Sequence, residues 1–183
     1  MQDRRYRIIK PRFNEGQVTR FEDLVNIVPK SVLASDLGKS SERFTNLIDH
    51  SEEFTIQELV LLGRRANLTL PEMLTLVAHN YSGKKRKDMQ DKDKRYDYVQ
   101  TMYRTEELKS FEMIFEIIPI YKVAKELKIK RHTLGKMIRQ IEKIQIRYLI
   151  SIGNFCRLSK DEIFLLAVNS YANQTNKKKV IKS

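Results

Sequence analysis

The stretch from Pro29 to Ile48, PKSVLASDLGKSSERFTNLI, recurs without a gap ninety residues later as PIYKVAKELKIKRHTLGKMI, from Pro119 to Ile138. In each copy the apolar spacing predicts two short helices joined by a tight turn. Ala34 and Ala124 stand where these two helices would cross. The recurrence predicts that the chain contains two copies of one helical unit.

The pairing extends well beyond these twenty residues, since Phe21 to Tyr81 aligns with Phe111 to Tyr171 at the same offset. Fifteen of the paired positions are identical, several times what average composition would produce by chance. Most of the identical residues are apolar and recur at three- or four-residue spacing. They predict an internal duplication with a shared helical core, rather than a catalytic set.

Capping signals divide the first copy into five expected helices. Pro29 ends the first helix, and Gly38 supplies the left-handed turn after the second. The segments Thr55 to Glu58 and Thr69 to Glu72 are capping boxes that open the fourth and fifth helices. The first, second and fourth expected helices cover residues 21–28, 31–37 and 56–66. The third is capped by Ser40 or Ser41 and ends in the polar run 50–53, and the fifth runs from the second box to about residue 81.

The segments before these helices also align, with Arg5 to Phe13 opposite Arg95 to Tyr103. We expect a helix in the second copy, because Tyr96, Val99 and Tyr103 fit one helical face. In the first copy Pro11 would interrupt a helix, so a shorter or extended element is expected there.

These patterns predict an all-α protein with a first domain at residues 1–82 and a second at residues 95–172. The charged segment 83–94, GKKRKDMQDKDK, indicates a flexible linker. It is either a solvated hinge or a linker whose basic half lies along phosphates. The basic tail 173–183 is expected to be disordered.

The net charge of +12 is unevenly distributed. Residues 5–82 hold ten basic and ten acidic side chains, whereas residues 95–172 hold fourteen basic and nine acidic ones. The rest of the excess lies in the linker and the tail. This asymmetry indicates attraction of the second copy to a polyanion.

Several other functions are disfavoured by the sequence. No apolar run is long enough for a membrane span, and no secretory signal opens the chain, so we expect a cytoplasmic protein without membrane contact. The single cysteine, Cys156, is expected to be buried on a helix. The three histidines lack metal-ligand spacing, and no phosphate loop or nucleophile motif occurs. We therefore expect no enzyme, no metal and no cofactor.

Five short helices with a helix-turn-helix at the second and third resemble the phage repressor and Cro family of DNA-binding domains. The resemblance covers residues 21–82 and 111–172, with Ala34, Gly38 and Phe44 at the family's crossing, turn and inward positions. The second copy departs from the pattern at Lys128, which replaces the turn glycine. The resemblance implies two tandem helix-turn-helix domains that each present one helix to double-stranded DNA.

The resemblance also implies base-reading positions at the start of the third helix of each copy and one turn later. Arg131 could pair with guanine and Asn46 with adenine. The expected base-reading residues are Ser41, Glu42, Asn46, Arg131, His132 and Lys136. The expected phosphate contacts are Lys30, Lys39, Arg43, Lys122, Lys125, Lys128, Lys130, Arg139 and Lys143.

Two functions remain open at this point. The first is a sequence-specific DNA-binding protein, a transcriptional regulator that covers two half-sites alone or as a homodimer. The second is a helical protein-interaction module, adaptor-like or antitoxin-like, without specific DNA recognition. Acidic residues such as Glu42 and Asp49 beside the first expected reading helix leave open whether that copy contacts bases or only packs.

Overall fold

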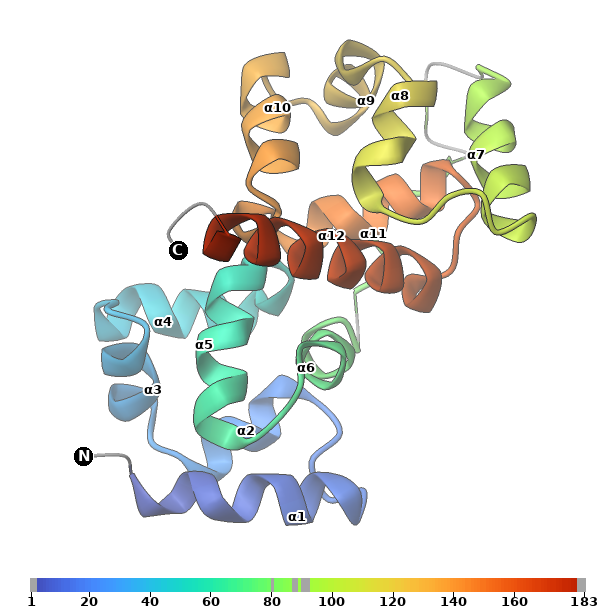
Figure 1. The fold of residues 1–183 in the computed structure, drawn as a ribbon. Coiled ribbons are helices and arrows are strands. Elements are labelled where there is room, and N and C mark those ends of the chain that lie inside the picture. The colour runs from blue at the N-terminus through green and yellow to red at the C-terminus, as the bar shows by residue number, and fades with distance from the viewer. Residues whose placement is uncertain (1–2, 80, 87–88, 90–92, 181–183) are drawn as a thin grey trace. The chain divides into compact units, whose positions relative to one another are not determined.

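A computed structural model describes residues 3–79, 81–86, 89 and 93–180, and every regular element in these residues is a helix (Figure 1). Within the described residues no helix is long and apolar enough to cross a membrane. Contacts divide the chain into unit 1, Met1–Tyr81, and unit 2, Ser82–Ser183. The expected all-α class is confirmed for the described residues.

Unit 1 begins with a 3₁₀ helix that continues into an α-helix, where a shorter or extended element was expected. Pro11 is the third residue of α1, in the first turn, where a missing amide hydrogen breaks no helical bond. The elements of unit 1 are η1 (Arg4–Ile8), α1 (Ile9–Asn14), α2 (Phe21–Ile27), α3 (Lys30–Asp36), α4 (Ser41–Asp49), η2 (Ser51–Glu53), α5 (Ile56–Ala66) and α6 (Leu70–Val77).

The predicted caps of α5 and α6 are confirmed. Thr55 and Glu58 exchange side-chain-to-amide hydrogen bonds of 3.3 and 2.8 Å, and Thr69 and Glu72 form the same box. α6 ends at Val77, four residues earlier than expected, and the Ser51 hydroxyl donates to the Val77 carbonyl at 2.9 Å. Such a bond satisfies one of the carbonyls that a helix leaves free at its end.

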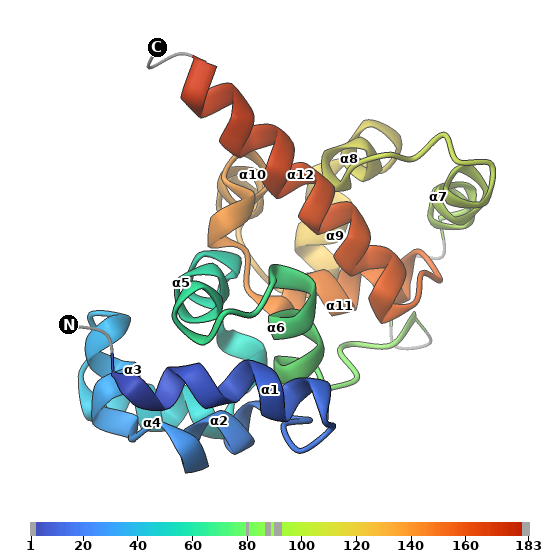
Figure 2. The same cartoon turned by 60° about the horizontal axis from the view of Figure 1, so that its bottom comes forward.

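Three aromatic rings form the centre of unit 1. Phe21 of α2, Phe44 of α4 and Phe54 after η2 are fully buried, with ring centroids 4.7 to 6.4 Å apart. Each buried ring removes a large apolar surface from water, and tilted or edge-to-face pairs add to this. Figure 2 shows the pair α3 and α4 lying beside α2. The core therefore holds α4 by its inner face and leaves its outer face exposed.

Unit 2 contains the same order of elements, each close to ninety residues after its counterpart. The expected helix at residues 95–103 is confirmed as α7. The elements are α7 (Arg95–Arg104), η4 (Phe111–Met113), α8 (Ile114–Ile117), α9 (Ile120–Leu127), α10 (Arg131–Arg139), η5 (Ile141–Lys143), α11 (Ile146–Phe155) and α12 (Lys160–Val180).

The turn between the paired helices has the same backbone in both units. Gly38 has a φ of 62°, and Lys128 has a φ of 57°. The residue after each turn donates its amide to Ala34 or Ala124, at 2.9 and 3.0 Å. Lys128 thus adopts the left-handed conformation expected of a glycine, at the modest cost that a side chain incurs there.

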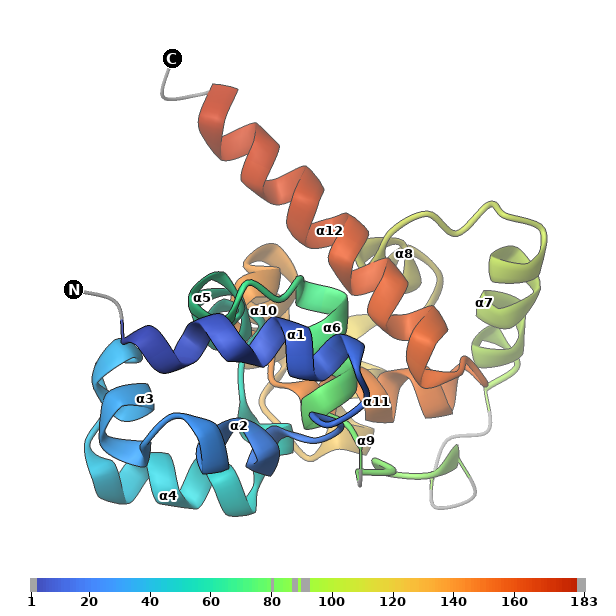
Figure 3. The ribbon, with the colours of Figure 1, turned by 90° about the horizontal axis from the view of Figure 1, so that it is seen from below.

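The tail predicted to be disordered from Asn173 is helical as far as Val180. α12 is much longer than its counterpart α6 and extends beyond α11 in Figure 3. Its last turns are stabilised by side-chain bonds, because Gln174 and Lys178 reach residues of η4 and η5. The prediction for residues 181–183 lies outside the described residues.

Several described residues of the segment predicted to be a flexible linker form bonds to helices of unit 2. Asn154 donates to the carbonyls of Ser82 and Lys84 at 2.6 and 3.2 Å, and Arg86 donates to the Phe155 carbonyl at 2.7 Å. Gly83 lies so close to α11 that an added Cβ would be 2.7 Å from Ile150. Residues 87–88 and 90–92 lie outside the described residues. The charge pattern did not reveal these bonds, because Lys84 accepts through its backbone carbonyl and Arg86 donates its guanidinium to a carbonyl far along the chain.

Candidate nucleic-acid interface

α10 has one buried and one exposed face. Leu134 and Ile138 point into the core of unit 2, which fixes the helix by its apolar side. The three base-reading residues predicted for this helix, Arg131, His132 and Lys136, are all exposed. They lie on the outer face together with Arg139, so α10 carries three permanent positive charges and no carboxylate.

α9 extends this positive surface. Tyr121, Lys125 and Lys128 recur at intervals of four and three residues, and all three are exposed. α9 and α10 pack against each other through the tight turn at Lys128. Lys130 adds one more charge between them. Six exposed cations lie on α9, α10 and the turn between them, and none of them forms an ion pair with a described residue. They are Lys125, Lys128, Lys130, Arg131, Lys136 and Arg139.

Tyr121 is a candidate contact that sequence reasoning missed. Its side chain is 55% exposed, although tyrosine usually buries most of its ring. The signal was an aromatic residue next to Lys122 on the outer stripe of a predicted helix. A tyrosine hydroxyl there can donate to a phosphate oxygen.

The one carboxylate on this helix pair does not reach the surface. Glu126 is 2% exposed, and its carboxylate lies 3.6 Å from the Lys84 ammonium, which also donates to the Glu126 carbonyl. Lys84 belongs to the segment expected to be a linker. By neutralising Glu126, it leaves the exposed charge of α9 and α10 entirely positive.

Two predicted phosphate contacts are engaged elsewhere. Lys39 is 12% exposed and forms an ion pair of 2.6 Å with Glu58. Lys122 forms an ion pair of 2.6 Å with Asp93, which also binds Arg95. Both lysines therefore stabilise their own unit, and the exposed phosphate candidates are Lys30, Arg43, Lys125, Lys128, Lys130, Arg139 and Lys143.

The corresponding surface of unit 1 is mixed in charge. Ser41, Glu42 and Asn46 are exposed on α4, as predicted, and Arg43 lies among them. Glu42 and Asp49 are also exposed, so acidic side chains outnumber the single basic one on this helix. Over the whole sequence, unit 1 holds 11 basic and 11 acidic residues, whereas unit 2 holds 24 and 12.

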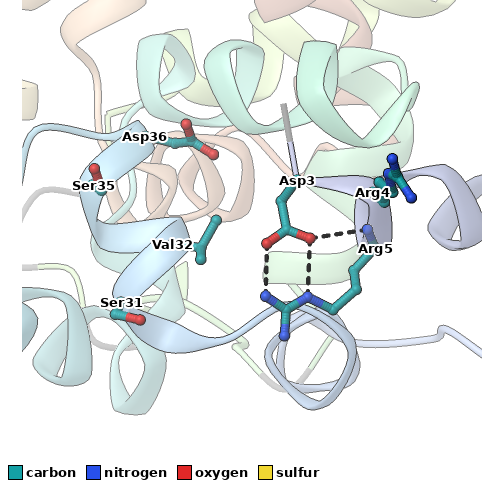
Figure 4. Close-up of a pocket in the computed structure, with 7 residues that line it drawn as sticks. All are labelled: Asp3, Arg4, Arg5, Ser31, Val32, Ser35 and Asp36. Carbon is teal, nitrogen blue, oxygen red and sulfur yellow. Dashed lines mark hydrogen bonds and ion pairs between the residues drawn. The ribbon is translucent and has the colours of Figure 1, made fainter. Parts of the chain in front are cut away.

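An open hollow of about 650 Å³ lies in unit 1 between η1 and α3 (Figure 4). Its two carboxylates are already engaged, because Asp3 binds Arg5 and Asp36 accepts from the Tyr6 hydroxyl at 2.6 Å. The Arg5 guanidinium lowers the pKa of Asp3 to about 2. No predicted site residue lines this hollow, and its charge is balanced.

The described residues contain no group of three histidine, cysteine, aspartate or glutamate side chains that could hold a metal. Cys156 is buried directly after α11, where desolvation raises the pKa of its thiol far above the ordinary value. A thiol in that state is a poor nucleophile.

No family model matches the chain, and no curated protein or solved structure matches it with significant similarity.

Proposed function

We propose that the chain is a non-enzymatic, double-stranded DNA-binding protein that contacts DNA through α9 and α10 of unit 2. In this proposal the two units are tandem helix-turn-helix domains, and α10 enters the major groove. The observation that carries it is the set of six exposed cations on α9, α10 and their turn that form no ion pair with a described residue, while the one carboxylate of this helix pair is buried.

The chemistry of the surface favours DNA over a merely soluble face. Cations that have no carboxylate partner are available to phosphates, and binding releases the counterions condensed on the duplex. Arg131 at the start of α10 has the forked geometry that matches a guanine edge, and Lys136 follows one turn and a half later. Specific recognition by these residues is consistent with a role as a transcriptional regulator.

Unit 1 has a smaller part in the proposed contact. The carboxylates Glu42 and Asp49 on α4 repel phosphates and oppose the attraction of Arg43. Whether two half-sites are contacted by one chain or by a homodimer is measured by the stoichiometry of the complex in analytical ultracentrifugation.

The test is the double substitution Arg131→Ala and Lys136→Ala in the full chain, measured by fluorescence anisotropy on a labelled duplex. If about six phosphates are neutralised, the wild-type slope of log K against log salt is near −5. The double variant should bind about a hundredfold more weakly, because each bidentate base contact is worth about 1–3 kcal/mol.

The matched control removes two exposed arginines that belong to unit 1 and to neither helix of this surface, Arg12→Ala and Arg64→Ala. It changes the net charge equally and should bind nearly as the wild type does. A salt slope near zero, or equal losses in both double variants, would contradict the proposal. Selection of bound sequences from a random DNA pool then measures specificity.

A further inference from the structure

A second hollow in unit 1, of about 250 Å³, lies where α2, the end of α4, η2 and the end of α6 meet. Its described lining residues include three carboxylates and no lysine or arginine. The residues that line it are Glu22, Asp49, His50, Ser51, Glu52, Leu76, Val77, His79 and Tyr81.

The corresponding place in unit 2 is filled by the last turns of α12. Gln174 donates its amide to Glu112 at 2.6 Å and to the Ile138 carbonyl at 3.1 Å, and its oxygen accepts from the Ile141 amide at 3.1 Å. Four residues later, the Lys178 ammonium binds Glu142 at 2.6 Å. Figure 1 shows the end of α12 near the lower end of α10, where Gln174 bonds to Ile138.

The acceptors of the two places correspond residue by residue. Glu22 is ninety residues before Glu112, and Glu52 is ninety residues before Glu142. Both pairs are identical and lie at equivalent points of the helical order, the start of α2 or η4 and the middle of η2 or η5. Unit 1 therefore retains the two carboxylates that bind the α12 side chains in unit 2.

What unit 1 lacks is the helix that these carboxylates would bind. α6 ends at Val77, whereas α12 continues for thirteen residues beyond the equivalent Ala167. Glu22 and Asp49 have no partner among the described residues, and Glu52 has only His50, at 3.6 Å. In unit 2 the bond from Lys178 lowers the pKa of Glu142, although burial opposes this.

We infer that this hollow is a docking site for a basic helix of a partner protein, one with a carboxamide side chain followed four residues later by a lysine. α12 shows that this pattern fits, since Gln174 and Lys178 occupy the equivalent acceptors. The hollow is more acidic than its counterpart because Asp49 stands at the position of Arg139. A helix with a second cation complements it better than α12 itself would.

The charge of the hollow and the bonds that already hold α12 favour a partner protein over nucleic acid or a second copy of the chain. Nucleic acid is disfavoured, because three carboxylates line the hollow and would face phosphates. A second copy of the chain would have to break the bonds of its own α12 to Glu112 and Glu142 before this helix could bind the hollow. The bonds lost would offset the bonds formed. A partner's helix loses no such bonds, and the site does not depend on DNA binding by unit 2.

The experiment adds a labelled peptide with the sequence of residues 169–179, NSYANQTNKKK, capped at both ends, to the full-length chain. Fluorescence anisotropy should detect binding that the chain variant Glu22→Gln with Glu52→Gln weakens at least about tenfold, the effect of losing an ion pair and a charged hydrogen bond. A peptide with alanine in place of its glutamine and of the lysine four residues later should lose binding similarly.

The matched control is Glu15→Gln with Glu42→Gln, which removes two exposed carboxylates of unit 1 outside the hollow. This control should leave peptide binding unchanged. An equal loss in both variants would reduce the effect to net charge and overturn the inference. Unchanged binding in the Glu22 and Glu52 variant would also overturn it.

Hydrogen exchange on the same samples locates the peptide and checks the fold. Protection should increase in α2, η2 and α6, and the variant should show wild-type exchange without peptide. Protection lost from α12 instead would place the peptide in unit 2 and exclude the docking site. Self-association of the chain that the Glu22 and Glu52 substitutions abolish would identify a second copy as the occupant and overturn the inferred partner protein.

Discussion

The helix pairs α3–α4 and α9–α10 share the same turn conformation but differ in the charge of their exposed surfaces. Both use a buried alanine at the crossing, a left-handed turn residue and inward apolar side chains on the second helix. Their outer faces differ, since α4 exposes Glu42 and Asp49 where α10 exposes His132 and Arg139. Packing constrains the buried positions, whereas exposed positions can change charge with little effect on stability.

A second contrast concerns the ends of the units. α6 stops at Val77, and Ser51 satisfies the last carbonyl, while α12 continues and binds the equivalent carboxylates with Gln174 and Lys178. The same acceptors thus bind side chains of α12 in unit 2, whereas the described residues of unit 1 supply no equivalent helix. Four predictions test how far the equivalence of the two units extends.

The largest effect is expected at the ion pair between Lys84 and the buried Glu126 in unit 2. Lys84→Met removes the ammonium beside the buried Glu126 carboxylate and its hydrogen bond to the Glu126 carbonyl, and should destabilise unit 2 by about 3 kcal/mol. Hydrogen exchange should show faster global opening in unit 2 and no change in unit 1. Lys85→Met, at an exposed neighbouring lysine, is the control, and an equal effect there would refute the role assigned to Lys84.

The next effect compares two glycines at equivalent positions. A Cβ on Gly63 would lie 2.7 Å from the Leu68 carbonyl oxygen, whereas one on Gly153 would lie 3.0 Å from Ile163 side-chain atoms. The contact at Gly63 is the shorter of the two, so Gly63→Ala should cost about 2 kcal/mol and Gly153→Ala about 1 kcal/mol. Urea denaturation measures the loss of unfolding free energy in both variants. A larger loss for Gly153→Ala than for Gly63→Ala would contradict the packing described at these two glycines.

A third prediction gives α4 of unit 1 the residues that α10 of unit 2 has at two equivalent positions. Glu42→His with Asp49→Arg gives α4 the residues that α10 has at those positions. If α4 lies near phosphates, DNA affinity should rise about tenfold at low salt and the salt slope should steepen by roughly one. An unchanged affinity would mean that α4 does not approach the duplex.

The smallest effect concerns the turn. Gly38→Ala should destabilise unit 1 by about 1 kcal/mol, because alanine is strained at a φ of 62°. Lys128→Gly should stabilise unit 2 by up to about 1 kcal/mol for the converse reason. Thermal unfolding should therefore shift in opposite directions for the two variants, and shifts of the same sign would argue against a shared turn.

Much of the fold followed from local chemistry. The boxes at Thr55 and Thr69 and the stop at Pro29 depend on residues within four positions of each other, so the helix boundaries could be predicted closely. Of the candidate site, the exposure of Arg131, His132 and Lys136 followed from the apolar spacing of α10.

What could not be predicted depends on partners far apart in the chain. The sequence by itself determined two helical segments with matching cores and the excess of charge in the second half, because periodicity, caps and composition are local. Only the tertiary structure decided that Lys84 neutralises Glu126, that Lys39 and Lys122 are engaged in ion pairs, and that α12 extends to bind Glu112. Those bonds join residues 19 to 62 positions apart, and their formation requires the core that brings them together.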